Sequence, residues 1–320
     1  MIVIFCSKED NYTHLIIEWL YYYKVEFIKI DLNDQKIEDI EIDIDKEDFV
    51  IKLKTNETIK YSEISFFLYR DGAIQMSNTP DNHKYKKIVS QYLELEQTTI
   101  QDYIYEKISK KTLGWINQKH LNKLHQLTIA KSNNLNIPYT KILNNKKSFI
   151  QFFKNKRAIT KGIQENVGIQ DSKTIYSQRV MKITSKDLPN IFFPSLFQEQ
   201  LNKLFEVRTF YLDGDFYSIA LIDNEKNLSI DMRDNYANHI YFRFDLPKEI
   251  ECNLTNFMKN IGLISGSIDM IYTKDNTFYF IEVNPEGQYE WVSDYGGYNL
   301  DKKIASFLKR KNDEFKTKQY

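Results

Sequence analysis

The chain has 320 residues, and its 44 lysines and arginines balance its 44 aspartates and glutamates. This zero net charge excludes a strong overall field for nucleic acids or acidic partners, and no apolar run approaches the ~18 residues that a membrane-spanning helix needs. The two cysteines, Cys6 and Cys252, lie far apart beside apolar residues, which indicates reduced thiols in a core. Residues 2–6 are too short for a signal-peptide core, so we expect a soluble, cytoplasmic protein of two or three domains.

The first third of the chain opens with a predicted β-α-β unit. Residues 2–6 form an apolar run typical of a buried strand, residues 13–23 have the spacing of an amphipathic helix, and residues 25–31 form a second strand. Further along we expect short strands or a hairpin, then a strand and a long helix, over residues 37–61, 64–69 and 83–108.

The middle of the chain alternates helices and extended segments. A helix over residues 121–134 is broken by Ile137-Pro138, and a second helix and a strand follow in turn. Gly162 and Gly168 bound a segment that we interpret as a flexible loop. The expected elements are an extended segment at 139–143, a helix at 147–155, and strands at 157–161, 174–182 and 191–200.

The last third contains two predicted hairpins. Residues 204–221 form one, turning at Asp213-Gly214, a dipeptide that favours tight two-residue turns. A helix over residues 249–261 precedes the second, and a C-terminal helix is expected over residues 300–312.

The second hairpin carries the most informative residues. Residues 279–283 are aromatic and β-branched, so they predict a strand on which Glu282 and Asn284 project to the same side. Asp269 lies in a second short run, and the turn at residues 273–276 folds that run back antiparallel. Three oxygen donors then converge, a set that suits Mg²⁺. Solvated hairpin carboxylates are the alternative. However, burying a carboxylate in an apolar strand costs free energy unless a cation or a hydrogen-bond donor lies beside it.

Several separated segments together resemble the ATP-grasp superfamily. In chain order they are a strand ending at Lys161, then 197–199, 206–208, 231–233, Asp269 and 282–285. Other segments resemble the grasp-with-spasm peptide maturases, relatives of the microviridin-type ligases that make graspetides. These segments are 1–7, 18–20, Tyr69-Arg70, 284–288 and 298–305. Graspetides are ribosomal peptides with ester or amide crosslinks between side chains.

The resemblance implies a mixed α/β (α+β) architecture. An N-terminal, Rossmann-like pre-ATP-grasp domain would span residues 1–120, a central lobe residues 121–196, and a C-terminal lobe residues 197–320, with the nucleotide held between the two lobes. It implies ATP and Mg²⁺ as cofactors and a precursor peptide, made of leader and core, as the partner. No nucleic acid or membrane is implied, and a homodimer is compatible with the resemblance.

The resemblance also assigns the nucleotide-binding residues. Lys161 ends an apolar strand before the glycine-bounded loop, where an ammonium can meet phosphates. Lys123 fits the position of a second phosphate-binding lysine, although an ordinary surface lysine is the alternative. Gln198, Glu199 and Leu201 would meet the adenine, largely through the main chain, and Glu206 would meet the ribose hydroxyls.

The expected catalytic residues are Arg208, Asp231 and Arg233. Arg208 lies on the same strand face as Glu206 and would point towards phosphate, and Arg233 would contact the transferring phosphate or the acyl oxygen. A surface pair of Asp231 and Arg233 is the alternative. Arg70 stands where the related maturases often have two adjacent arginines, but here its neighbour is Tyr69, which leaves a contact with a substrate carboxylate open.

These assignments imply an ATP-dependent ligase. The peptide-maturase hypothesis has Asp or Glu side chains of a precursor activated as acyl phosphates and joined to Thr or Ser hydroxyls or Lys amines. An amino-acid ligase of the glutamate-ligase type would share every nucleotide-binding residue, and a non-catalytic nucleotide-binding protein is a further alternative. The set of five intact residues favours catalysis over a decayed site; they are Asp269, Glu282, Asn284, Lys161 and Arg208.

Overall fold

The computed structural model describes residues 1–7, 10–31, 36–55, 57–72, 74–76, 85–116, 121–163, 167–170, 173–176, 180–223 and 239–318. Contacts divide the chain into two units, the first made of residues 1–120, 285–293 and 299–320, and the second of residues 121–284 and 294–298. The division of the chain into three domains, with a lobe boundary between residues 196 and 197, stays a prediction. Within the described residues, no helix is both long and apolar enough to cross a lipid bilayer.

The first unit is built on a four-stranded parallel sheet of order β2-β1-β6-β8. Helix α1 connects β1 to β2, which confirms the predicted β-α-β unit, and the Asp10 side chain caps its first turn. Residues 2–5 are all buried, as is typical of a strand covered on both faces. The bounds are β1 Ile2–Phe5, α1 Asn11–Tyr22, β2 Phe27–Ile30, β6 Phe66–Tyr69 and β8 Thr112–Leu113.

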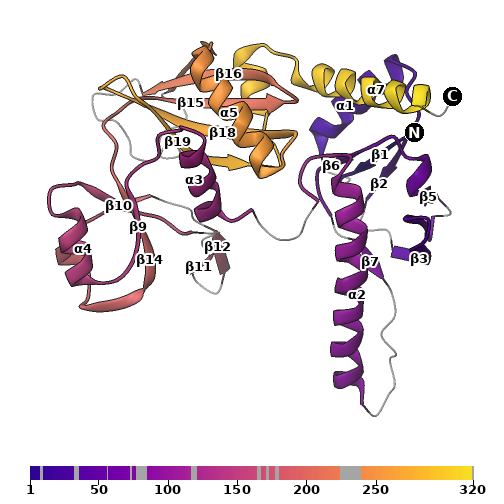
Figure 1. The fold of residues 1–320 in the computed structure, drawn as a ribbon, viewed down its shortest axis with the longest axis horizontal. Coiled ribbons are helices and arrows are strands. Elements are labelled where there is room, and N and C mark those ends of the chain that lie inside the picture. Colours follow the sequence, from indigo (N-terminus) through magenta and orange to yellow (C-terminus); the bar gives the residue numbers. More distant parts are fainter. Residues whose placement is uncertain are drawn as a thin grey trace. The chain divides into compact units, whose positions relative to one another are not determined.

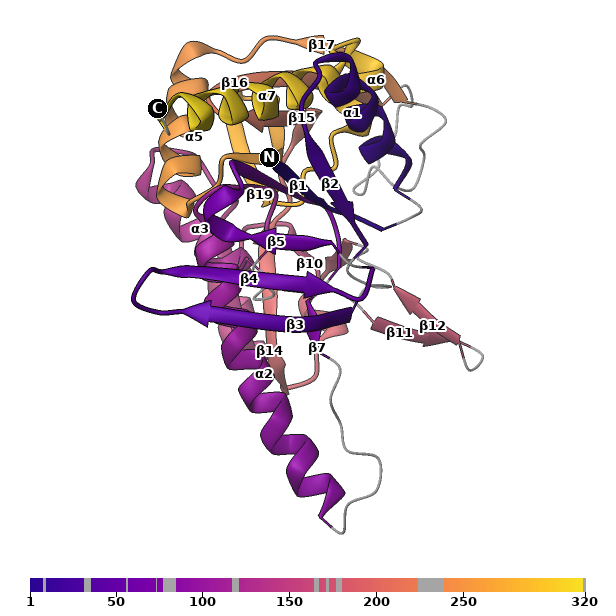
Figure 2. The same ribbon diagram turned by 90° about the vertical axis from the view of Figure 1, so that its right-hand side faces the viewer.

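A second sheet of the first unit has the order β5-β4-β3-β7. Strands β3 and β4 form the long antiparallel hairpin that Figure 2 shows, and the short strands expected over residues 37–61 are confirmed. The bounds are β3 Lys36–Asp43, β4 Asp48–Leu53, β5 Thr58–Lys60 and β7 Gln75–Met76.

Two long helices complete the first unit. Helix α2 spans Lys86–Ser109, and its buried residues begin only at Gln101. Helix α7 spans Leu300–Lys318, six residues beyond the predicted end, and packs against α1, where Trp19 Nε1 donates to Asp301 Oδ2 at 2.7 Å. The short helix α6, Glu290–Gly296, was not predicted.

The second unit contains an antiparallel sheet of order β13-β10-β14-β9. Phe149 and Phe153 of α4 pack on Phe197 of β14 and form the core beneath this sheet. The bounds are α3 Lys123–Ser132, β9 Thr140–Asn145, α4 Lys146–Phe153, β10 Ala158–Thr160, β13 Met181–Ile183 and β14 Ile191–Glu199.

The predicted glycine-bounded loop is partly wrong. Gly168 lies inside strand β11, Val167–Gln170, where it pairs with Ile175 of β12, Lys173–Tyr176. Val167 and Ile169 flank the glycine with β-branched side chains, and their strand preference outweighs one glycine.

The five-stranded sheet of the second unit has the order β17-β16-β15-β18-β19 and is antiparallel throughout. The predicted hairpin between β15 and β16 is confirmed, with Asp213 and Gly214 at positive φ of 49° and 106°. Helix α5 packs on the sheet (Figure 1), and the ring centroid of its Phe257 lies 4.7 Å from that of Phe280. The bounds are β15 Lys203–Leu212, β16 Asp215–Asp223, β17 His239–Phe244, α5 Lys248–Ile261, β18 Ser265–Thr273 and β19 Phe278–Asn284.

Candidate nucleotide and metal site

A row of charged residues crosses three adjacent strands of the five-stranded sheet. Arg208 of β15 pairs in register with Asp269 of β18, which pairs in turn with Glu282 of β19. Residues directly opposite on neighbouring strands have their Cβ atoms about 4.5–5.5 Å apart. Asn284 follows two residues after Glu282 and pairs with Ser267. The structure thus brings Asp269, Glu282 and Asn284 together on the hairpin that the sequence predicts.

A β-bulge in β19 shapes this row. Asp269 pairs with Glu282 but the next residue, Met270, pairs with Phe280, so Ile281 is the extra residue. Phe280 and Val283 are consequently both buried although they are three positions apart. Simple alternation along the strand did not predict this step. Bulges re-aim side chains next to functional sites, and this one separates the buried Phe280 from the polar end of the strand.

Three cations surround the two carboxylates. Lys123 Nζ, from the first turn of α3, lies 3.2 Å from Glu282 Oε2, and Lys161 Nζ, directly after β10, lies 3.7 Å from the same oxygen. The Arg208 guanidinium forms an ion pair with Asp269. Lys123 therefore belongs to this cluster, and its role in binding phosphate stays a prediction. The five side chains together carry one net positive charge, which suits a polyanionic ligand.

The two carboxylates have different electrostatic surroundings. Burial raises the pKa of Asp269 to about 6, with a further increase from the charge of Glu282, and Arg208 only partly opposes it. Burial would also raise the pKa of Glu282, but the charges of Lys161 and Lys123 outweigh it and hold that pKa below its ordinary value. The cluster thus favours the ionised form of Glu282. Further positive charge, such as a metal ion, would stabilise the ionised form of Asp269.

The predicted adenine residues lie at the end of β14. Gln198 is buried, and its Nε2 donates to Thr140 Oγ1 at 3.0 Å, while Glu199 forms a 2.6 Å ion pair with Lys156. Leu201 follows in the segment that joins β14 to β15. Both polar side chains thus have protein partners, and adenine contacts of Gln198, Glu199 and Leu201, largely through the main chain, stay a prediction.

Glu206 precedes Arg208 by two residues on the same face of β15. Its Oε1 accepts a hydrogen bond from Lys203 Nζ at 2.7 Å, and both side chains are largely buried. The lysine fixes the carboxylate beside the charged row, where the resemblance implies a ribose contact.

No protein-family model matches the chain, and no curated protein matches it. Solved structures do. A RiPP-associated ATP-grasp ligase of Chryseobacterium gregarium, in complex with ADP and a leader and core peptide, aligns with a TM-score of 0.79 at 21% identity, over 97% of this chain and 96% of that one.

The macrocyclase MdnC of Microcystis aeruginosa MRC, bound with precursor peptide MdnA, aligns with a TM-score of 0.72 at 24% identity, over 97% and 99% of the two chains. The ATP-grasp ligase PsnB, complexed with a minimal precursor, gives 0.73 at 15% identity, over 97% and 98%. The chain has the ATP-grasp fold. The predicted fold class is therefore confirmed, and the similarity extends over nearly the full length.

The carboxylates of this ATP-grasp fold are suited to Mg²⁺. Glu282 Oε2 is buried and accepts no hydrogen bond of good geometry, although the two lysines lie near it. Among the described residues, no three or more His, Cys, Asp or Glu side chains cluster as a metal site. Asp269, Glu282 and the Asn284 amide instead offer two carboxylates and one amide oxygen as possible ligands. Mg²⁺ usually takes one or two carboxylates and leaves its other positions to phosphates and water.

Arg70 lies in the first unit and contacts several protein groups. Its Nε donates to Asp10 Oδ2 at 3.2 Å and one terminal nitrogen donates to Glu290 Oε1 at 3.0 Å. The other terminal nitrogen donates to the carbonyl oxygens of Glu286 and Gly287 at 3.0 and 3.3 Å. The guanidinium thus anchors the segment after β19. In this arrangement it is committed to the protein, which favours a structural role over contact with a substrate carboxylate.

Asp231 and Arg233 lie outside the described residues, so their catalytic roles stay predictions. Sequence analysis did not identify Gln126, a buried side chain of α3 whose Oε1 accepts from Val283 N at 2.9 Å. Its one signal is its position three residues after Lys123, on the same helix face.

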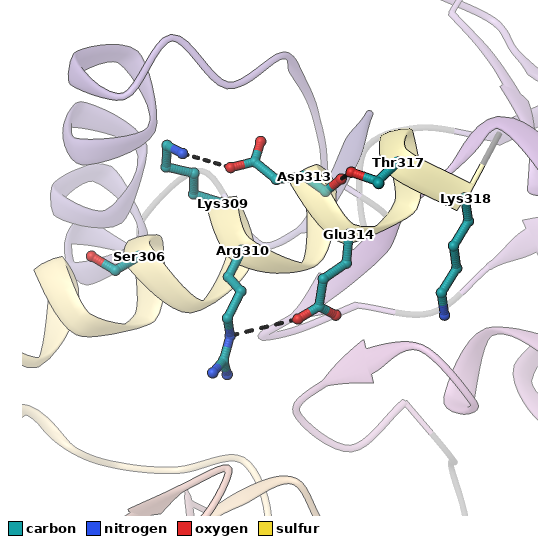
Figure 3. Close-up of a pocket in the computed structure, with 7 residues that line it drawn as sticks. All are labelled: Ser306, Lys309, Arg310, Asp313, Glu314, Thr317 and Lys318. Atoms are coloured by element: carbon teal, nitrogen blue, oxygen red, sulfur yellow. Dashed lines mark hydrogen bonds and ion pairs between the residues drawn. The ribbon is translucent and has the colours of Figure 1, made fainter. Parts of the chain in front are cut away.

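A surface hollow of about 540 Å³ lies elsewhere, along α7 (Figure 3). All seven lining residues come from this one helix, and its charges pair with each other, as Lys309 does with Asp313 at 2.6 Å. The residues are Ser306, Lys309, Arg310, Asp313, Glu314, Thr317 and Lys318. None is a predicted site residue, and one helix cannot enclose a ligand.

The contact between Lys123 and Glu282 yields a testable prediction. Lys123→Ala should weaken ATP binding about tenfold or more, since hydrogen bonds to charged groups contribute about 1.5–3 kcal/mol. Lys131→Ala is the matched control, because Lys131 is an exposed lysine of the same helix. Nucleotide titration of both variants measures the effect, and equal affinities would contradict the phosphate role of Lys123.

Proposed function

We propose that the chain is an ATP-dependent peptide maturase, a graspetide synthetase. The observation that carries the proposal is the row of Arg208, Asp269 and Glu282 across three strands, with Lys123 and Lys161 at its end, on an ATP-grasp fold. Such a cluster can bind a magnesium nucleotide, and structures with this fold were solved with precursor peptides.

Each residue of the site has a role in this proposal. Asp269, Glu282 and Asn284 would hold Mg²⁺, and Lys123 and Lys161 would bind phosphate oxygens. Gln198, Glu199 and Leu201 would bind the adenine and Glu206 the ribose. Arg208 and Arg233, with Asp231 beside it, would offset the negative charge that develops on the oxygens during phosphoryl transfer and acyl transfer. When bound, ATP would supply the phosphoryl group and Mg²⁺ would neutralise charge on its oxygens.

The proposed reaction has two steps that conserve all atoms. A side-chain carboxylate of the precursor attacks the γ-phosphorus of ATP, which gives an acyl phosphate and ADP. A Thr or Ser hydroxyl or a Lys amine then attacks the acyl carbon and gives up its proton to the departing phosphate or to solvent, and phosphate leaves with formation of an ester or amide. No enzyme nucleophile is needed. A cytoplasmic location, where ATP is available, is part of the proposal, and a homodimer stays a prediction.

The direct test is mass spectrometry of a precursor peptide. Incubation with the enzyme, ATP and Mg²⁺ should lower the peptide mass by one water for each ring, with one ADP released per ring. The precursor to use is a short peptide encoded beside this chain and rich in Thr, Ser or Lys and in Asp or Glu. ADP release with free glutamate and no mass change in any precursor would instead support the amino-acid ligase.

A further inference from the structure

Gln126 is a buried polar side chain that binds the strand carrying two of the proposed metal ligands. It is 2% exposed, and its Oε1 accepts a hydrogen bond from the backbone N–H of Val283 at 2.9 Å. Its Nε2 donates to the Leu121 carbonyl oxygen at 3.4 Å. Buried amides are found almost always with hydrogen-bond partners, and the partner here is the one residue that separates Glu282 from Asn284.

The position of β19 in the sheet explains why this bond matters. The strand is last in the order β17-β16-β15-β18-β19, so its outer edge has no neighbouring strand within that sheet. Phe280 N instead donates to the Asn136 carbonyl oxygen at 2.8 Å. Further along the same edge, the backbone N–H of Val283 donates to the Gln126 side chain. Asn136, whose Nδ2 also donates to the Phe278 carbonyl oxygen at 3.4 Å, thus holds the outer edge before the bulge, and the Gln126 amide holds it after the bulge.

The bulge increases the need for this second contact. Ile281 interrupts the regular ladder between Phe280 and Glu282, and a bulge disrupts pairing and bends its strand. The Gln126 bond lies directly beyond the interruption. It fixes the peptide plane between Glu282 and Val283, while Lys123, one helical turn earlier on α3, contacts the Glu282 carboxylate.

We propose that Gln126 is a positioning residue, which holds the backbone of β19 so that Glu282 and Asn284 project towards one metal ion. The inference rests on the proposed magnesium-nucleotide site and deepens it. A neutral amide suits this role, because it accepts the hydrogen bond without adding charge beside Glu282 and Lys123. When a group that hydrogen-bonds to metal ligands and orients them is removed, the metal affinity typically falls about 10–100-fold.

The test compares two buried glutamines. Gln126→Met removes the acceptor while keeping a side chain of similar length. Gln101→Met is the matched control, since Gln101 is also buried, lies in the first unit, and donates from its Nε2 to the Ile74 carbonyl oxygen. ADP binding is measured by calorimetry in EDTA and over a Mg²⁺ titration, with thermal melting of each variant. For Gln126→Met we expect the half-saturating Mg²⁺ concentration to rise about tenfold or more, with ADP affinity in EDTA unchanged and Gln101→Met like wild type.

Two further measurements make the result decisive. Gln126→Glu retains an oxygen acceptor for the Val283 N–H, so its half-saturating Mg²⁺ concentration should stay below that of Gln126→Met. In metal-free Gln126→Met, amide hydrogen exchange at Val283 should become faster. Unchanged Mg²⁺ dependence in Gln126→Met, or an equal loss of ADP binding with and without metal, would overturn the inference. A wild-type protein without Mg²⁺-dependent ADP binding would overturn the proposed function itself, and with it the inference.

Discussion

Asp269→Asn and Glu282→Gln should each lower ATP turnover by about 10²–10³-fold or more, the scale seen when one preorganised electrostatic group is removed from an active site. Both substitutions keep the shape of the side chain and remove the charge that would bind Mg²⁺. Asp269 and Glu282 face each other in register on β18 and β19. Losing either one therefore leaves a single carboxylate in the row.

The fold should survive both changes. Both substitutions keep the size of the side chain and an oxygen that can accept hydrogen bonds, and burial already raises the pKa of Asp269 to about 6, so a neutral asparagine also relieves part of a desolvation cost. Asp275→Asn is the matched control, because Asp275 is an exposed carboxylate in the turn of the same hairpin. Coupled assays of ADP release and circular dichroism give the two readouts. Wild-type turnover in either site variant would remove these residues from the metal site.

The hairpin was predictable because its signals are local. A short polar turn between two apolar runs fixes an antiparallel pair, and side-chain alternation places Glu282 and Asn284 together. The opening β-α-β unit was predictable for the same reason. Alternation failed at Ile281, since a bulge depends on pairing with β18 and on the packing of Phe280 beneath α5. Neither interaction can be recognised from the sequence of residues 279–283 alone.

Long-range contacts account for what the sequence did not reveal. Gln126 and Val283 are 157 residues apart in the chain, and a glutamine on a polar helix has no feature that marks it as buried. Arg70 was a candidate substrate contact because of its position in a motif. Only the structure shows that Asp10 and Glu290 both form ion pairs with its guanidinium.

The extension of α7 has a local cause that the hydrophobic pattern does not capture. The last turns of this helix are polar, so periodicity ends near residue 312. Charged pairs one turn apart, such as Lys309 with Asp313 and Lys311 with Glu314, support the helix beyond that point. Burial of Asn312 against Ser65, whose Oγ donates to Asn312 Oδ1 at 2.8 Å, fixes the start of this extension.

Removing the leader from the precursor should slow macrocyclisation by about 10²–10⁴-fold, because a linked leader raises the effective concentration of the core at the site. The ATP affinity should stay unchanged. The charged row is reachable from solvent without any peptide, since the side chains of Lys123, Lys161, Glu282 and Arg208 are 28%, 16%, 26% and 30% exposed. Nucleotide binding and peptide binding are therefore expected to be separable.

The experiment compares three substrates at equal core concentration: the full precursor, the core alone, and the core with the leader added as a separate peptide. Only the first provides the linked leader, so the separate leader should restore at most part of the rate. An acyl phosphate exposed to water would hydrolyse, so the core alone should also release more ADP per ring formed. A precursor with a scrambled leader of the same composition is the control. If the core alone reacts as fast as the full precursor, or free amino acids are ligated rapidly, the chain does not depend on a leader and the amino-acid ligase becomes the better assignment.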